Sequence, residues 1–207
     1  MITVAVQDRT GKEVGNLTVD EATFGGCVRY ALLKQALVMY HANKHIGTAA
    51  TKSRGMVEGS TRKLYKQKGT GNARAGNART CVRKGGGVCF AKDPRSTRKD
   101  MPKQQRKLAM NSAILAKLQS GNVIIIDELK MDQPRTKDFA AVLNNLKIDR
   151  SCLVTISDFD NNIYLSTRNV PKIDVLKVDQ LNAGDICNKQ KMLFTRQAFE
   201  SLLNVEN

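Results

Sequence analysis

Four carboxylates stand where two apolar segments of the sequence end, and they could act on phosphate groups through a bound metal ion. The apolar segments are Val123–Ile126 and Leu153–Ile156. The carboxylates that follow them are Asp127, Glu128, Asp158 and Asp160. In open α/β sheets ligands sit at the carboxyl ends of strands, where carboxylate oxygens can hold Mg²⁺ for phosphoryl or phosphodiester chemistry. The alternative is that these residues cap the helices and loops that follow them, as acidic residues commonly do.

An NTPase would also need a phosphate-binding loop upstream of the first apolar segment. The pattern is G-x-x-x-x-G-K-[ST], in which the lysine contacts phosphate and the hydroxyl contacts the metal. Gly71–Gly76 supplies the two glycines, but Asn77 and Ala78 stand where the lysine and the hydroxyl are needed. No strand is predicted before this stretch and no helix after it. A metal-dependent RNA-processing enzyme or NTPase that uses the four carboxylates is therefore kept only as the alternative function.

Histidines and cysteines do not predict a metal site in this chain. His41 and His45 have the spacing of an H-E-x-x-H zinc helix, but Ala42 occupies the position of the general base. The cysteines are Cys27, Cys81, Cys89, Cys152 and Cys187, and none has C-x-x-C spacing. We expect all five to be reduced thiols of a cytosolic protein. The sequence predicts no metal and no cofactor.

Basic side chains give a much stronger indication of function. The net charge is +15, and residues 41–110 hold 18 of the 34 lysines and arginines but only three acids, so the rest of the chain is neutral. A local excess of this size predicts a polyanionic partner. The candidate RNA-binding side chains are Lys52, Arg54, Arg62, Lys63, Tyr65, Lys66, Lys68, Arg74, Arg79, Arg83, Lys84, Lys92, Arg95, Arg98, Lys99, Lys103, Arg106 and Lys107. Lysine and arginine neutralise phosphates, and the ring of Tyr65 is a candidate for stacking on an unpaired base.

Glycine is concentrated in the same part of the chain as the positive charge. Nine of the 15 glycines lie between Gly47 and Gly87, where apolar periodicity disappears. Such a segment buries too little apolar surface to offset its ordering entropy, and a long structureless loop inside a domain is usually functional. A solvated tail and an anionic membrane surface are the competing interpretations. The loop is internal and offers no amphipathic face, so we predict a loop, residues 45–95, that orders on RNA.

The rest of the chain predicts an α/β domain. Short strands are expected at Ile2–Val6, Val14–Val19, Val123–Ile126, Leu153–Ile156, Val175–Val178 and Met192–Phe194. Helices are expected at 27–41, from Pro102 to Gly121, around Phe139, Leu143 and Leu146, and after Thr195 as N-cap. This alternation predicts a mostly parallel sheet with helices on both faces in Rossmann-like layering. We expect one α/β domain over residues 1–207, with the basic loop inserted in it.

The loop and its flanks resemble one known family. The matching elements are Gly47-Thr48, Lys52–Arg54, Lys63–Gly76, Gly85–Phe90, Pro102–Ala113 and Asn182–Asp185. Lys63–Gly76 and Gly85–Phe90 are similar to the loop signature and the G-G-G-V-x-F element of large-subunit ribosomal protein four, the universal L-four family. The resemblance covers nearly the whole chain, and the chain length resembles that of the bacterial type.

The resemblance implies a non-enzymatic constituent of the large ribosomal subunit. It implies a globular α/β domain, a long loop that reaches into 23S rRNA during assembly, and a cytoplasmic location on the ribosome. The loop tip of the family lines the nascent-peptide exit tunnel together with large-subunit protein twenty-two. By resemblance the tip here is Gln67, Lys68, Gly69, Thr70, Gly71, Asn72, Ala73 and Arg74. The implied partners are 23S rRNA, other large-subunit proteins and the nascent peptide, with no membrane and no small-molecule substrate.

This chain departs from the family at the loop tip. Leu64 and Tyr65 stand where the family usually has Pro-Trp, and Asn72 stands where it usually has Arg. The aromatic group is smaller and the tip has one positive charge fewer. These differences bear on the contacts at the tunnel wall rather than on RNA binding as such.

Overall fold

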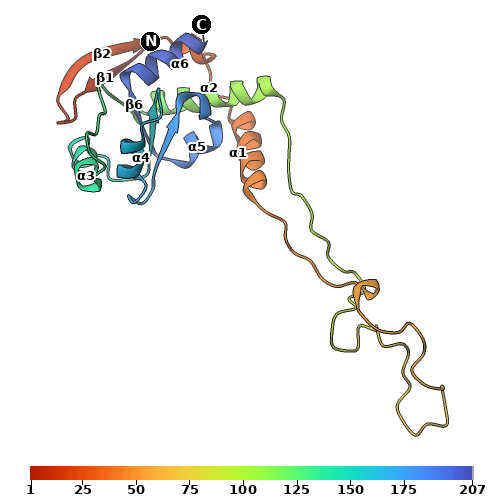
Figure 1. Cartoon of the computed structure of the whole chain (residues 1–207). Coiled ribbons are helices and arrows are strands. Elements are labelled where there is room, and N and C mark those ends of the chain that lie inside the picture. Colours follow the sequence, from red (N-terminus) through yellow and green to blue (C-terminus); the bar gives the residue numbers. More distant parts are fainter. Residues whose placement is uncertain (207) are drawn as a thin grey trace. The chain divides into compact units, whose positions relative to one another are not determined.

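The protein is described by a computed structural model that covers residues 1–206, with side chains described as far as Asn204. Its chain divides into two compact units. The body consists of residues 1–41 together with the chain from Asp100 onward, and the loop unit is Ala42–Lys99. Figure 1 follows the chain through both units from the N-terminus, in red, to α6, in blue.

A six-stranded sheet forms the centre of the body. The strands are β1 (Ile2–Gln7), β2 (Glu13–Val19), β3 (Val123–Ile126), β4 (Cys152–Ile156), β5 (Ile173–Lys177) and β6 (Lys191–Thr195). Their order is β2-β1-β3-β6-β4-β5. β1 and β2 pair antiparallel through a tight turn, in which Gly11 has a φ of 80°. The other neighbouring pairs run parallel, so the carboxyl ends of β3, β6 and β4 lie at the same edge.

Helices of very different length lie between and after these strands. They are α1 (Tyr30–Lys44), α2 (Lys103–Gln119), α3 (Thr136–Asn145), α4 (Asn161–Thr167), α5 (Ala183–Asn188) and α6 (Arg196–Glu206). Short 3-10 turns occur at η1 (Glu21–Phe24), η2 (Arg54–Met56) and η3 (Val178–Gln180). α2 begins directly after Pro102 and ends before Gly121, whose left-handed backbone suits a position just past a helix end.

Two clusters of buried apolar side chains hold the body together. Along β6, Met192 and Phe194 belong to the first cluster and Leu193 to the second, because side chains of a strand alternate between the two faces. α2 and α6 supply much of the first cluster, including Leu115 and Phe199. α3 and α4 supply part of the second. β3, β4 and β6 are thus covered on both sides, which explains why they read as continuous apolar runs.

The predicted α/β class is confirmed in its broad form, a mixed α/β body with one sheet and helices. Three details of the sequence analysis were wrong. The strand expected at Val175–Val178 is β5, Ile173–Lys177, and Val178 begins the 3-10 turn η3. The first helix spans Tyr30–Lys44 instead of 27–41, because Gly25 and Gly26, both at positive φ, form a turn before it. Helices α4 and α5 were missed, since seven and six residues are too few to show a helical period.

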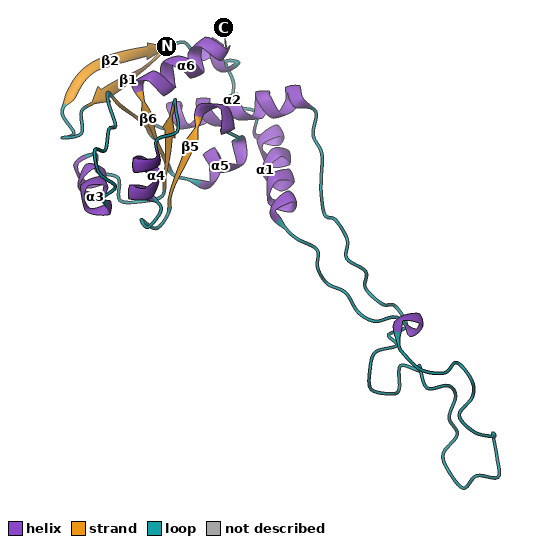
Figure 2. Ribbon diagram, in the orientation of Figure 1, coloured by secondary structure: helices purple, strands orange, loops and turns teal. Residues whose placement is uncertain are grey.

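The loop unit contains little regular structure. Apart from η2 and the last residues of α1, its residues form turns, bends and irregular segments, drawn in teal in Figure 2. An isolated parallel bridge joins Ser53 to Val88. Among the described residues, no helix is both long enough and apolar enough to cross a membrane.

Candidate nucleic-acid interface

Two arms of the loop unit, residues 42–52 and 88–99, lie side by side. Near their base, the Asn43 amide oxygen accepts a 2.8 Å hydrogen bond from the Lys99 backbone N–H, and its amide nitrogen donates back to the Lys99 carbonyl. Farther along, the Thr51 N–H donates to the Lys92 carbonyl at 2.9 Å, and the Lys92 N–H donates to the Thr51 hydroxyl at 2.8 Å. These reciprocal bonds tie the arms together without a β-ladder.

Gly47 permits the close approach of the two arms. A Cβ atom at this position would stand 2.0 Å from the Arg95 carbonyl oxygen, which no side chain could occupy. The hydroxyl of Thr97 reinforces the same region by donating to the Ala42 carbonyl at 2.9 Å. The arms therefore bring basic residues of two distant sequence stretches, such as Lys52 and Arg95, into one narrow unit.

The tip of the loop is a small hairpin closed by four hydrogen bonds. The Leu64 N–H donates to the Gly76 carbonyl at 3.0 Å. The Lys63 ammonium donates to the Gln67 side-chain oxygen at 2.8 Å and to the Ala75 carbonyl at 3.1 Å. The Tyr65 hydroxyl donates to the Ala73 carbonyl. Lys63 and Tyr65 thus shape the tip, in addition to any contact with RNA.

A third set of contacts joins three segments in the middle of the loop unit. The N–H groups of Gly87 and Val88 both donate to the Lys52 carbonyl at 3.1 Å. A Cβ atom on Gly87 would lie 2.8 Å from the Arg79 carbonyl oxygen and 3.3 Å from the Cys81 nitrogen. The three segments around residues 52–53, 79–81 and 87–89 therefore pack backbone against backbone.

The predicted RNA-binding residues divide between the two units. Fifteen, from Lys52 to Lys99, lie in the loop unit, and Lys103, Arg106 and Lys107 lie in the first turns of α2. All are exposed except Tyr65 and Arg79, which are half-buried. The stretch between Glu58 and Asp93 contains no carboxylate. Its many cations therefore have no acidic neighbour in sequence and are presented to solvent.

The start of α2 carries charge of the wrong sign for helix stability. Lys103, Arg106 and Lys107 occupy its first turns, and the first turn has no acidic residue. The amino end of a helix has a partial positive charge, so a cation in the first turn, such as Lys103, is unfavourable there. A nearby anion would offset that repulsion, and exposed backbone N–H groups at the same helix end also favour anions.

Phe90 is a surface feature that the sequence analysis did not single out. Its side chain is 93% exposed, far more than the half-buried ring of Tyr65. With Gly47, Lys92 and Arg95 it lines a pocket of about 500 Å³ within the loop unit. An exposed aromatic ring beside two cations is suited to stacking on a base whose phosphate they neutralise. Only the surrounding charge hinted at this role in the sequence.

The structure brings the four strand-end carboxylates around one pocket of about 230 Å³. Three of them already have partners within the protein. Asp127 pairs with Arg196 at 3.5 Å, Glu128 pairs with Lys130 at 3.1 Å, and Asp160 accepts a 2.8 Å bond from the Asn162 N–H as N-cap of α4. The hydrogen bond to Glu200 raises the pKa of Arg196 most, and the hydrogen bond to Asp127 raises it further.

These interactions match the capping interpretation for Asp160 and give no support to a metal site. Across residues 1–206, no group of three or more His, Cys, Asp or Glu side chains is placed to hold a metal ion. The alternative of a metal-dependent enzyme at this edge has no support in the arrangement of its residues.

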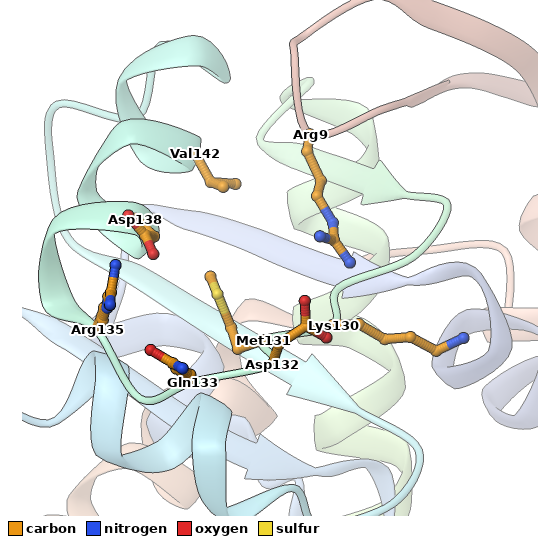
Figure 3. Close-up of a pocket in the computed structure, with 8 residues that line it drawn as sticks. All are labelled: Arg9, Lys130, Met131, Asp132, Gln133, Arg135, Asp138 and Val142. Atoms are coloured by element: carbon orange, nitrogen blue, oxygen red, sulfur yellow. The ribbon is translucent and has the colours of Figure 1, made fainter.

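Another pocket of the body, of about 450 Å³, lies beside the segment that follows β3 (Figure 3). Figure 3 shows Met131 between the side chains of α3 and that of Arg9, which comes from the β1–β2 turn. The lining residues are Arg9, Lys130, Met131, Asp132, Gln133, Arg135, Asp138 and Val142. They include no histidine, cysteine, serine or threonine.

Comparison with known proteins identifies the family of the chain. The family model described as "Ribosomal protein L4/L1 family" matches residues 17–205. The chain belongs to the ribosomal protein L4/L1 family. A protein of Pelotomaculum thermopropionicum named "Large ribosomal subunit protein uL4" is 42% identical over 198 residues, which cover 96% of each chain. Proteins of the same name from Moorella thermoacetica and Rhodopirellula baltica are 42% and 40% identical, over 94% and 97% of this chain and 94% and 90% of theirs.

Membership of the L4/L1 family confirms the resemblance found in the loop signature. The match extends over the body and the loop unit alike, from β2 to α6. The aligned relatives are nearly the same length as this chain, so their agreement covers the whole architecture. The exposed cations of the loop unit therefore belong to a ribosomal protein.

Proposed function

We propose that this protein is a structural constituent of the large ribosomal subunit and that it binds 23S rRNA through the loop unit and the start of α2. The L4/L1 family is structural and non-enzymatic, and the relatives are named as large-subunit proteins. Its location is the cytoplasm, as part of the ribosome. The observation that carries the RNA-binding role is the set of exposed cations between Lys52 and Lys107.

The loop unit has many exposed cations but contributes no residue to either buried apolar cluster. The buried apolar clusters belong to the body. The segments of the loop unit are held together by backbone hydrogen bonds outside regular helices and strands. Bringing so many like charges together raises the free energy of the compact form. Phosphates relieve that repulsion, and the release of their counterions favours binding. We therefore expect a bound polyanion to stabilise the loop unit.

We also propose that residues 45–95 form an extended loop inserted in a single Rossmann-like α/β domain. The parallel pairing of β1, β3, β6, β4 and β5 supports the layering, as do the buried clusters on both faces of the sheet. The scarcity of helix and strand between Ile46 and Pro102 supports the extended loop.

At the tip, Gln67–Arg74 is proposed to line the nascent-peptide exit tunnel beside large-subunit protein twenty-two. This step rests on the family resemblance. Tyr65 and Lys63 support it locally, because they close the hairpin that presents those residues. Asn72 in place of the family's usual arginine leaves a less positive tip for the nascent peptide to pass.

Ultraviolet cross-linking of intact large subunits, followed by peptide mapping, tests this proposal. We expect cross-links between 23S rRNA and peptides that contain Phe90, Tyr65 and the cations of the loop unit and of α2. The pocket with the four strand-end carboxylates should give none. Cross-links confined to residues 1–41 and 120–204 would refute the proposed interface while leaving membership of the subunit intact.

A further inference from the structure

Two exposed thiols of the loop unit face each other. The Sγ atoms of Cys81 and Cys89 are 3.8 Å apart. All five cysteines are free thiols in the structure, and Cys81 and Cys89 are both exposed. A disulfide needs its sulfur atoms about 2.0 Å apart, so the two sulfur atoms would have to approach each other further for a bond to form.

Backbone contacts on both sides of the pair support this proximity. Gly87 packs against residues 79–81, with the position of its absent Cβ only 3.3 Å from the Cys81 nitrogen. Val88 is anchored on Lys52 by a 3.1 Å hydrogen bond. Cys89 follows Val88 in the sequence, so the contacts of residues 87 and 88 position its thiol next to that of Cys81.

The chain between the two cysteines is well suited to closing a ring. It contains Gly85, Gly86 and Gly87, all at positive φ, a backbone conformation that other residues resist. It also contains Arg83 and Lys84, both exposed and both candidates for phosphate binding. A covalent link from residue 81 to residue 89 would therefore restrict two cations of the proposed interface.

We propose that Cys81 and Cys89 form a redox-active dithiol that low-molecular-weight disulfides oxidise to an internal disulfide. One thiolate attacks a sulfur of the small disulfide, forms a mixed disulfide and releases one small thiolate. The second cysteine, as its thiolate, then attacks the Sγ atom of the first cysteine in the mixed disulfide. This forms the internal disulfide and releases the second small thiolate. Two electrons pass from the protein to the small disulfide, and the two protons of the cysteines leave with the released thiols.

Among the described residues, no second thiol is in contact with any of the other three cysteines, so these should react differently. Cys152 is fully buried, and burial raises the pKa of its thiol to about 12. Burial also raises the pKa of the half-buried Cys187. Cys27 is exposed, so it should accept a small thiol as a mixed disulfide and stop there. It is a matched internal control for the pair.

The test is to treat the purified full-length protein with glutathione disulfide, trap free thiols with an alkylating agent, and map the peptides without reduction. We expect an internal Cys81–Cys89 link to exceed mixed disulfides at these positions by roughly tenfold, because the second thiol acts intramolecularly. Cys27 should carry glutathione. In Cys81→Ser, Cys89 should instead retain glutathione, while Cys27→Ser should leave the internal link unchanged.

The rate of formation distinguishes this proposal from aggregation. The internal link should appear at a rate independent of protein concentration, and trypsin should then cut more slowly at Arg83 and Lys84. Glutathione retained on both cysteines of the parent chain, or links between chains, would overturn the proposal. Because this assay needs no ribosome, its failure would not affect the proposed rRNA-binding role.

Discussion

Gly87 lies so close to Arg79 that a Cβ atom at residue 87 would stand 2.8 Å from the Arg79 carbonyl oxygen. Gly87 also has a φ of 77°, in the region that favours glycine. The contact is the point at which two segments of the loop unit pack together, and nothing larger than glycine fits there. The order of this basic segment therefore depends on backbone packing rather than on an apolar core.

Replacing Gly87 with alanine should disturb the loop unit and spare the body. Strain of about 1–3 kcal/mol is expected from the left-handed backbone, in addition to the steric conflict. Trypsin should cut Gly87→Ala faster at Arg79 and Arg83, whereas its thermal unfolding should match that of the parent. Gly76→Ala is the control, because its Cβ would meet only the Thr80 methyl at 3.8 Å. Equal cleavage of the two variants would contradict the packing argument.

Removing the ring of Phe90 should weaken RNA binding without affecting stability. Stacking of one base on an aromatic side chain is worth about 1–3 kcal/mol, so Phe90→Ala should lower affinity for a 23S rRNA fragment by roughly five- to 150-fold. Val82→Ala is a suitable control, since Val82 is 91% exposed but carries no ring. Filter binding at fixed salt would measure both. Indistinguishable affinities would exclude Phe90 as a stacking residue.

Neutralising cations of the loop tip should change the salt dependence of binding. The triple variant Lys66→Gln, Lys68→Gln, Arg74→Gln removes three exposed charges. Each phosphate contact contributes about 0.7–0.9 to the slope of log affinity against log salt, so the slope should become shallower by roughly 2–3.

The control for that experiment removes the same charge from the body. Lys12, Lys34 and Lys137 are exposed there, and their replacement by glutamine should leave the slope nearly unchanged. If the body variant flattened the slope as much as the tip variant does, the binding surface would have to be moved to the body.

Cys152 should make the stability of the body depend on alkaline pH. Burial raises its pKa from 9.0 to about 12, so the thiol ionises in the unfolded chain first. Between those values the unfolded state binds fewer protons, and the free energy of unfolding falls as pH rises. The contribution is intact below pH 9 and should shrink by about 1.4 kcal/mol at pH 10. Urea unfolding of Cys152→Val should lack this decrease, and Cys27→Ser should retain it. Parallel curves for all three proteins would rule out the effect.

Much of the body could be predicted from the sequence because burial leaves a clear pattern. Val123–Ile126 was predicted with its observed bounds, since a strand covered on both faces is apolar throughout. Thr195 was expected to cap the last helix, and its hydroxyl does accept a 3.3 Å bond from the Ala198 N–H. Short elements were harder. For α4 and α5 the only local signals were the capping residues Asp160 and Asn182.

The charge of the candidate site could be predicted, but its geometry could not. Exposed cations are visible in composition, whereas the approach of Gly47 to Arg95 depends on residues far apart in sequence that show no periodicity. Phe90 was part of the family element Gly85–Phe90, but it was not predicted as a stacking residue, for a different reason. An apolar side chain in a sequence is more often buried than exposed, and nothing local distinguishes the two cases.

Sedimentation of ribosomes through a high-salt sucrose gradient, with mass spectrometry of every fraction, tests the central claim most directly. The protein should be recovered from its own cells in the large-subunit peak, in one-to-one ratio with other proteins of that subunit. High salt removes loosely bound basic proteins. Retention of the protein in the large-subunit peak at high salt would therefore require a specific interface with the subunit. Recovery at the top of the gradient would contradict the claim that the protein is a constituent of the large ribosomal subunit.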